Sequence, residues 1–130
     1  MPENRPNLLF VFGDQWRAQA TGFGGSADVK TPHLDALAKQ SLHVRNCVAG
    51  SPVCCVWRAS MLTGQYPHQH GVVLNDGVLS PEAYTFGEHF AEAGYDTAWV
   101  GKWHVDGHGR AAYIPRQRQH RFGYWRTLEC

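Results

Sequence analysis

The sequence has no long hydrophobic run and no excess of charge of either sign. Its first apolar run, Leu8 to Phe12, is far too short for a membrane span or a signal-peptide core, and residues 1–7 hold no basic leader segment. Twelve basic and eleven acidic residues leave a net charge of +1, which does not predict an electrostatic partner. We therefore expect a cytoplasmic protein that binds neither nucleic acid nor a membrane.

Cysteine is also scarce. Its four positions are Cys47, Cys54, Cys55 and Cys130. Two of these are adjacent, which makes a poor disulfide framework, and no Cys-x-x-Cys pair is present to indicate a structural zinc site. The apolar fraction of 43% and the charged fraction of 18% are ordinary for a globular domain. No repeat or linker interrupts the chain, so residues 1–130 are predicted to form part of one domain.

Three segments are predicted to be strands. The run from Asn7 to Phe12 lies between Pro6 and Gly13 and is typical of a strand buried on both faces. Shorter strands are predicted at 43–48 and at 96–101.

Three helices are predicted between these strands. Thr31-Pro32 is typical of a helix start and predicts a helix over about 32–42. A second helix should begin at Cys54 or Cys55 and end at Gly64, and a third should follow Thr85 through residue 93. The order strand, helix, strand, helix, helix, strand predicts an α/β fold with a mainly parallel sheet flanked by helices.

Two pairs of residues are candidates for a functional site when only the neighbouring sequence is considered. Asp14 and Gln15 follow the first predicted strand, at the end where α/β sheets gather ligand-binding loops, although a turn-forming aspartate explains this position equally well. Cys54 and Arg58 should share a helix face near a helix N-terminus, which favours anionic oxygens. The alternative for this second pair is a half-buried thiol beside an exposed arginine.

The stretch Cys54-Cys-Val-Trp-Arg58, followed by Ala59-Ser-Met-Leu-Thr-Gly64, resembles the signature of the sulfatases, which is Cys-x-Pro-x-Arg before a short helix ending in Leu-Thr-Gly. The resemblance continues in order through four further motifs of this chain. These are Asp14-Gln15, Thr31-Pro-His-Leu-Asp35, Tyr66-Pro-His68 and Gly101-Lys-Trp-His104. Asp14-Gln-Trp16 is also similar to the metal-binding start of phosphonate monoester hydrolases within the same alkaline phosphatase superfamily.

The resemblance implies that Cys54 is oxidised to formylglycine by a formylglycine-generating enzyme. The hydrated aldehyde would attack the sulfur of a small-molecule or carbohydrate sulfate ester, and its second hydroxyl would allow sulfate to leave without a stable ester. The resemblance further implies that Asp14, Gln15 and Cys54 bind Ca²⁺, or another divalent cation such as Mg²⁺ or Mn²⁺, which would polarise the sulfate.

The remaining implied roles concern anion recognition. Arg58 would hold the hydrate, and Lys102 and His104, two residues apart on one side of an extended segment, would reach the sulfuryl oxygens while Trp103 points into the core. Asn75 matches a substrate-contacting position of the phosphonate hydrolases, with a turn-forming Asn75-Asp-Gly77 as the alternative.

Two departures from the family pattern bear on function. Val56 stands where the signature has proline, and the further metal ligands of the family would lie beyond residue 130. We therefore expect residues 1–130 to be the N-terminal part of a truncated sulfatase catalytic domain, a sulfuric ester hydrolase that is incomplete by itself. The alternatives are a phosphonate or phosphate ester hydrolase on the same fold and a non-catalytic remnant.

Overall fold

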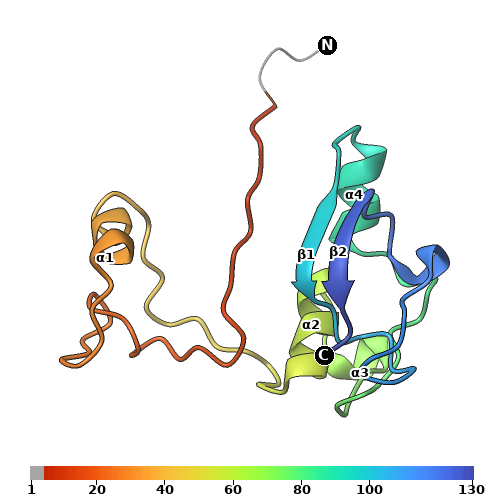
Figure 1. The fold of residues 1–130 in the computed structure, drawn as a ribbon, viewed down its shortest axis with the longest axis horizontal. Coiled ribbons are helices and arrows are strands. Elements are labelled where there is room, and N and C mark those ends of the chain that lie inside the picture. The colour runs from red at the N-terminus through yellow and green to blue at the C-terminus, as the bar shows by residue number, and fades with distance from the viewer. Residues whose placement is uncertain (1–4) are drawn as a thin grey trace. The chain divides into compact units, whose positions relative to one another are not determined.

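A computed structural model describes residues 5–130 and divides the chain into two compact units, one up to Cys47 and one from Val48 to Cys130. Each unit is described by itself. Figure 1 shows their elements in chain order. Within the described residues, no helix has the length and apolar character needed to cross a membrane.

The first unit contains one helix, α1 (Pro32–Ala38), which begins with proline at its first turn as the sequence predicted. The Asp35 carboxylate accepts hydrogen bonds from the Phe23 N–H and the Thr31 hydroxyl, both at 2.8 Å, and Thr31 Oγ1 in turn accepts the Gly22 N–H. A Cβ on Gly22 would lie 2.3 Å from an Asp35 oxygen. Thr31 and Asp35 therefore hold the loop at Gly22 and Phe23 against α1.

The prediction of strands at 7–12 and 43–48 is wrong, because neither segment has regular secondary structure. Four side chains of the first segment are exposed by more than half: Leu8, Leu9, Phe10 and Val11. A strand forms only where a neighbour supplies backbone hydrogen bonds, and no strand occurs in described residues 5–47. The helix predicted to reach residue 42 also ends earlier, at Ala38.

The second unit packs three helices and a short 3-10 turn with a sheet of two strands. The helices are α2 (Cys54–Thr63), α3 (Pro67–His70) and α4 (Phe86–Glu92); the strands are β1 (Ala98–Lys102) and β2 (Tyr124–Leu128); the 3-10 turn is Arg116–Arg118. β1 and β2 run parallel, with Ala98 opposite Tyr124. The fold class is therefore α/β with a parallel sheet, as predicted.

Local signals explain where the helices of this unit begin and end. Gly64 ends α2 in the left-handed region, at φ 69°, which glycine adopts at little cost. Thr85 and Glu88 form the predicted capping box at the start of α4. β1 begins two residues later than predicted and extends to Lys102, while α3 and β2 were not predicted.

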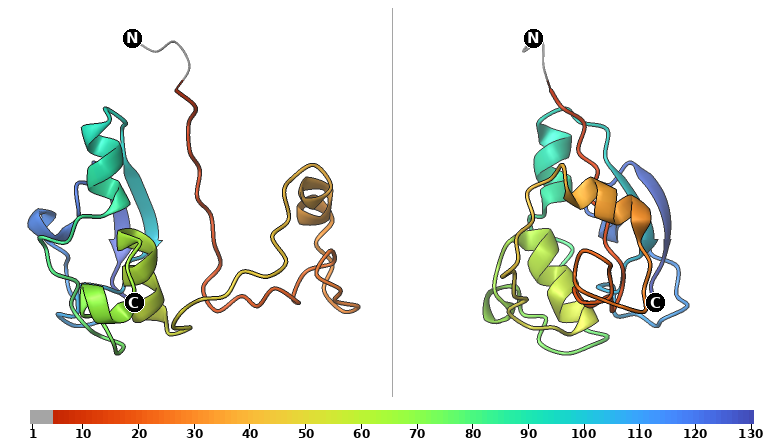
Figure 2. Two further views of the ribbon diagram at one scale, coloured as in Figure 1. Left: turned by 180° about the vertical axis from the view of Figure 1, so that it is seen from behind. Right: turned by 90° about the vertical axis from the view of Figure 1, so that its left-hand side faces the viewer.

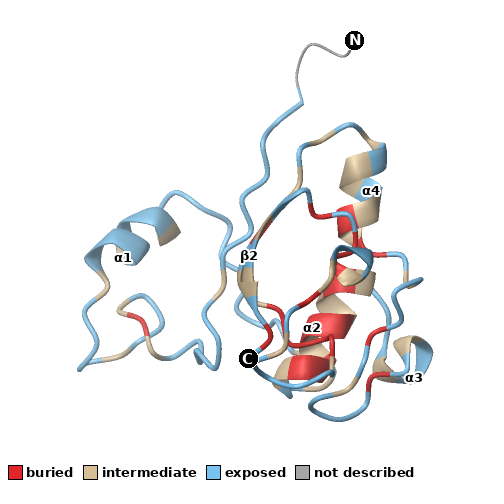
Figure 3. Ribbon diagram, turned by 45° about the vertical axis from the view of Figure 1, so that its right-hand side comes forward, coloured by how far each residue is buried: buried red, intermediate tan, exposed pale blue. Residues whose placement is uncertain are grey.

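The core of the second unit lies between α2, α4 and one face of the sheet. Figures 1 and 2 show both helices on the same side of β1 and β2, and Figure 3 shows the buried face of α2. Trp103 is central, with rings of Trp99 and Trp125 at 5.1 and 5.0 Å between centroids. Burial of Trp103, at 1% exposure, confirms the prediction that it points into the core.

Candidate functional site

Two of the predicted site residues, Cys54 and Asn75, meet at the N-terminus of α2. Cys54 is the first residue of this helix and is partly exposed. Asn75, 21 residues later, lies against it, with Asn75 Oδ1 at 3.6 Å from Cys54 Sγ and accepting the Cys55 N–H at 3.1 Å. The N–H groups of a first helical turn lack partners within the helix, so the Asn75 amide satisfies one of them.

Asn75 and Asp76 also form a turn, and Asp76 has a positive φ of 59°. The alternative interpretation of this segment as a turn therefore agrees with the structure. The turn and the contact with α2 are compatible, because the turn is what brings the Asn75 amide to the helix start.

Arg58 lies one turn further along α2 and is buried, with 3% exposure. Its Nη1 donates to the backbone oxygen of Lys102, the last residue of β1. The alternative of an exposed arginine beside Cys54 is therefore wrong. Burial is possible because the carbonyl at the end of β1 supplies an acceptor for the cationic guanidinium.

His104 differs from its predicted conformation. It has a left-handed φ of 57° and 1% exposure, so the chain does not continue as an extended segment from Lys102 through His104. The Glu129 carboxylate holds this bend by accepting the N–H groups of His104, Asp106 and Gly107 at 3.1, 2.8 and 2.8 Å. The prediction that Lys102 and His104 lie on one side of an extended segment is therefore wrong, because the segment bends at His104.

The His104 ring is held by Asp76. Its Nε2 lies 3.0 Å from Asp76 Oδ1, and its Nδ1 is buried without a hydrogen-bond partner among described residues 5–130. Because an ionised carboxylate only accepts, the Nε2 atom carries the proton in this contact. Arg110 donates to the same carboxylate through Nε and Nη2, at 3.1 and 3.0 Å.

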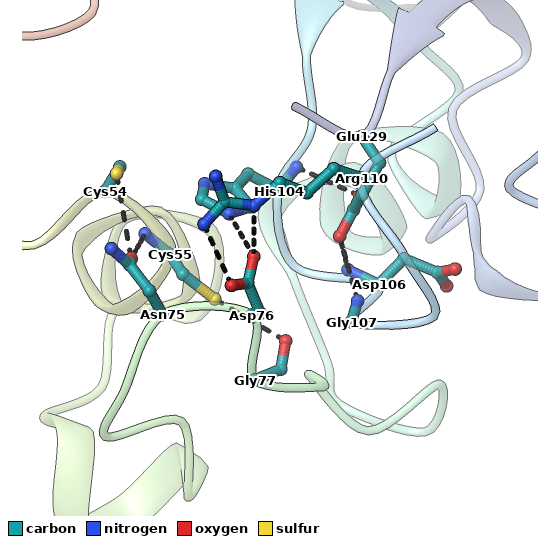
Figure 4. Close-up of polar contacts among 10 residues, drawn as sticks. All are labelled: Cys54, Cys55, Asn75, Asp76, Gly77, His104, Asp106, Gly107, Arg110 and Glu129. Carbon is teal, nitrogen blue, oxygen red and sulfur yellow. Dashed lines mark hydrogen bonds and ion pairs between the residues drawn. The ribbon is translucent and has the colours of Figure 1, made fainter. Parts of the chain in front are cut away.

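The Arg110 hydrogen bonds, followed by the His104 bond, lower the pKa of Asp76 from 3.8 to about 2. Asp76 is therefore a carboxylate at neutral pH. Figure 4 shows the Arg110 and His104 side chains meeting at Asp76, with Asn75 beside the start of α2. Sequence reasoning missed Asp76, Arg110 and Glu129 because their contacts join residues 22 to 34 positions apart.

The predicted metal ligands fall in different units. Asp14 and Gln15 form an exposed turn of the first unit, whereas Cys54 belongs to the second. Their carboxylate and amide oxygens are hard donors that suit Ca²⁺ or Mg²⁺. Described residues 5–130 contain no group of three or more His, Cys, Asp or Glu side chains arranged to hold a metal. The donor chemistry fits a divalent cation, while metal binding stays a prediction.

The fold and the ordered motifs define an α/β protein with a cysteine at a helix N-terminus. Comparison with known proteins assigns the family, because the sulfatase family model matches residues 6–129. The chain is 50% identical over 126 residues to an ulvan-active sulfatase of Formosa agariphila, covering 97% of this chain and 25% of that protein. It is 33% identical to an endo-4-O-sulfatase of Bacteroides thetaiotaomicron, covering 92% and 30%. The chain belongs to the sulfatase family.

Solved structures agree with this assignment. A protein of Bacteroides fragilis described as a sulfatase superposes with a TM-score of 0.84 at 29% identity, covering 100% of this chain and 33% of that one. A second protein, solved in complex with its substrate D-glucosamine-2-N,6-O-disulfate, superposes with a TM-score of 0.78 at 30% identity. The match covers 89% of this chain and 22% of that protein's chain. The chain thus spans about a fifth to a third of the length of these relatives.

Proposed function

We propose that the protein containing this chain hydrolyses a carbohydrate sulfate ester with a formylglycine nucleophile formed from Cys54 and with a divalent cation. The position of Cys54 carries this proposal. It starts α2, it is partly exposed, and an amide oxygen of Asn75 lies 3.6 Å from its sulfur. Several relatives are named for sulfated carbohydrates, among them an N-acetylglucosamine-6-O-sulfatase of Bacteroides thetaiotaomicron.

Formylglycine would supply a hydrated aldehyde with two hydroxyl groups. One hydroxyl would attack sulfur, and the other would allow sulfate to leave. The residues of this chain orient that group and the substrate. Asn75 contacts both Cys54 and the next backbone N–H, so it fixes the direction in which position 54 points. The free N–H groups at the start of α2 favour the anionic oxygens of a sulfuryl group near position 54.

Arg58 places a buried cation one turn along α2 from Cys54. Its guanidinium donates to the Lys102 carbonyl at the end of β1, and the Lys102 side chain would supply a second cation to the site. Fixed cations stabilise charge that develops on a sulfuryl group during ester cleavage. His104 would contact the same group, and Asp14 and Gln15 would hold the Ca²⁺ or another divalent cation that polarises it.

Mass spectrometry tests the nucleophile. The full-length protein is purified from a host that contains a formylglycine-generating enzyme, and the tryptic peptide covering residues 46–58 is examined. Conversion of Cys54 to formylglycine should lower its mass by about 18 Da. Unmodified Cys54 in a host that converts other sulfatases would exclude this mechanism and favour a non-catalytic remnant.

Product analysis tests the reaction. Converted protein should release inorganic sulfate from N-acetylglucosamine 6-sulfate or a related sulfated sugar in the presence of Ca²⁺, and Cys54→Ala should abolish release. Cys55→Ala serves as the matched control, since it removes the neighbouring thiol and leaves position 54 intact. Release of phosphate from phosphate esters, or of the alcohol and free phosphonate from phosphonate esters, without release of sulfate, would instead identify a phosphoester or phosphonate ester hydrolase.

A further inference from the structure

Arg110 is an exposed cation whose guanidinium is nevertheless fixed. Its side chain is 63% exposed, and it makes a two-point hydrogen bond to the Asp76 carboxylate through Nε and Nη2. This fork geometry holds the guanidinium plane in one orientation. Arginine has five N–H donors, and the two that bind Asp76 leave three directed elsewhere.

The backbone of Arg110 is fixed as well. Its carbonyl oxygen accepts the Cys130 N–H at 3.1 Å, and the surrounding turn is closed by the Ala112 N–H donating to the Gly109 oxygen at 2.8 Å. A solvated surface arginine gains little from such anchoring at both ends, because its long side chain loses rotamer freedom. Fixing an exposed cation lowers the entropy cost of binding an anion to it.

Arg110 is joined to the proposed nucleophile through Asp76 and Asn75. Asp76 directly follows Asn75, which contacts Cys54. Figure 4 shows this sequence of neighbours from the start of α2 to the Arg110 guanidinium. These contacts therefore join an exposed, fixed cation to the position where the sulfate would lie.

We propose that Arg110 binds a second anionic group of the substrate, a sulfate or a carboxylate, next to the sulfate ester that is cleaved. The inference rests on the proposed function, because it places the cleaved ester at Cys54. Arginine suits either anion, since its remaining donors match two oxygens of a planar carboxylate or of a sulfate. Asp76 acts as the positioning residue that holds the guanidinium.

Binding measurements on the full-length protein with Cys54→Ala test the inference separately from catalysis. Calorimetry in the presence of Ca²⁺ would compare three probes. N-acetylglucosamine 6-sulfate carries one anionic group, glucosamine-2-N,6-O-disulfate adds a second sulfate, and a sulfated uronic acid adds a carboxylate. Arg110→Ala should weaken binding of a doubly charged probe by about tenfold and binding of the singly charged probe by less than about twofold.

Arg110→Lys should give an intermediate loss for the doubly charged probes, because lysine keeps the charge and loses the fork. Arg121→Ala is the matched control, as Arg121 is another exposed arginine paired with a carboxylate, that of Glu92, and it should change no affinity. The relative loss for the disulfate and for the uronate identifies which anion Arg110 recognises.

Equal losses for all three probes, no loss for any, or no binding of any probe would overturn the inference. Sulfate release by the protein with Cys54 intact is measured in parallel with the singly charged probe. Failure of that release, with the difference in binding preserved, would overturn the proposed function and leave the anion site standing.

Discussion

The carboxylate of Glu129 holds the backbone of His104 although 25 residues separate them, with Glu129 Oε2 accepting the His104 N–H at 3.1 Å. Its other oxygen accepts the N–H groups of Asp106 and Gly107, both at 2.8 Å. Glu129 is 2% exposed, so these three donors replace the water that an ionised carboxylate would otherwise bind. The bend that places His104 beside Asp76 therefore depends on one side chain at the end of β2.

Replacing Glu129 with glutamine should destabilise the protein. A glutamine has a single acceptor oxygen, so its amide nitrogen would face either the His104 N–H or the pair of N–H groups at 106 and 107. We expect a loss of about 1–3 kcal/mol, the range for an unsatisfied buried group, measured by urea unfolding. Glu82→Gln removes the same charge from an exposed position and should change stability little. Equal stability of the two variants would contradict this role.

Asn75→Ala should weaken the start of α2. The alanine removes the oxygen that accepts the Cys55 N–H, which is the kind of contact a helix cap provides. The expected loss is about 1 kcal/mol in the free energy of unfolding. Asn75→Asp keeps an acceptor of the same size and should restore most of this loss. If alanine and aspartate were equally destabilising, the hydrogen bond would not be the source of the effect.

The predictability of this region depends on how local each interaction is. The bounds of α2 follow from signals inside the segment, such as Gly64 in a left-handed conformation. The bend at His104 follows from Glu129, which sequence patterns around residue 104 do not contain. Likewise, the run at 7–12 has the composition of a buried strand, but pairing requires a partner strand that composition cannot supply. Residue types at the site were predictable, whereas their hydrogen-bond partners were not.

Asp76 should make stability depend on pH in the acid range. Its pKa is lowered from 3.8 to about 2 in the folded protein, first by Arg110 and then by His104. Between these values the unfolded state binds more protons, so the contribution is present above about pH 3.8 and is lost as pH falls through about 2. Carboxyl NMR titration should find the low pKa, and Arg110→Ala should return it toward 3.8. Asp76→Asn should remove this part of the pH dependence of unfolding.

The two adjacent cysteines should differ in reactivity. Burial raises the pKa of the Cys55 thiol above its ordinary 9.0, and this side chain is 0% exposed, whereas Cys54 is partly exposed. Because the thiolate is the reactive form, iodoacetamide at pH 8 should modify Cys54 well before Cys55 in unconverted protein. Peptide mass spectrometry over time measures the order, and unfolding in urea should abolish the difference. Equal rates in the folded protein would show that Cys55 is accessible.

Val56→Pro restores the proline of the family signature and should raise the fraction of Cys54 converted to formylglycine. Val56 is the third residue of α2, where the N–H has no acceptor within the helix, so proline can be accommodated there. The buried valine loses some packing, at a cost of about 1 kcal/mol, which unfolding measurements would detect. Val56→Ala is the matched control, since it also loses apolar volume without adding the ring. Conversion that is unchanged in Val56→Pro, measured by mass spectrometry of the 46–58 peptide, would show that the maturation enzyme does not read this position.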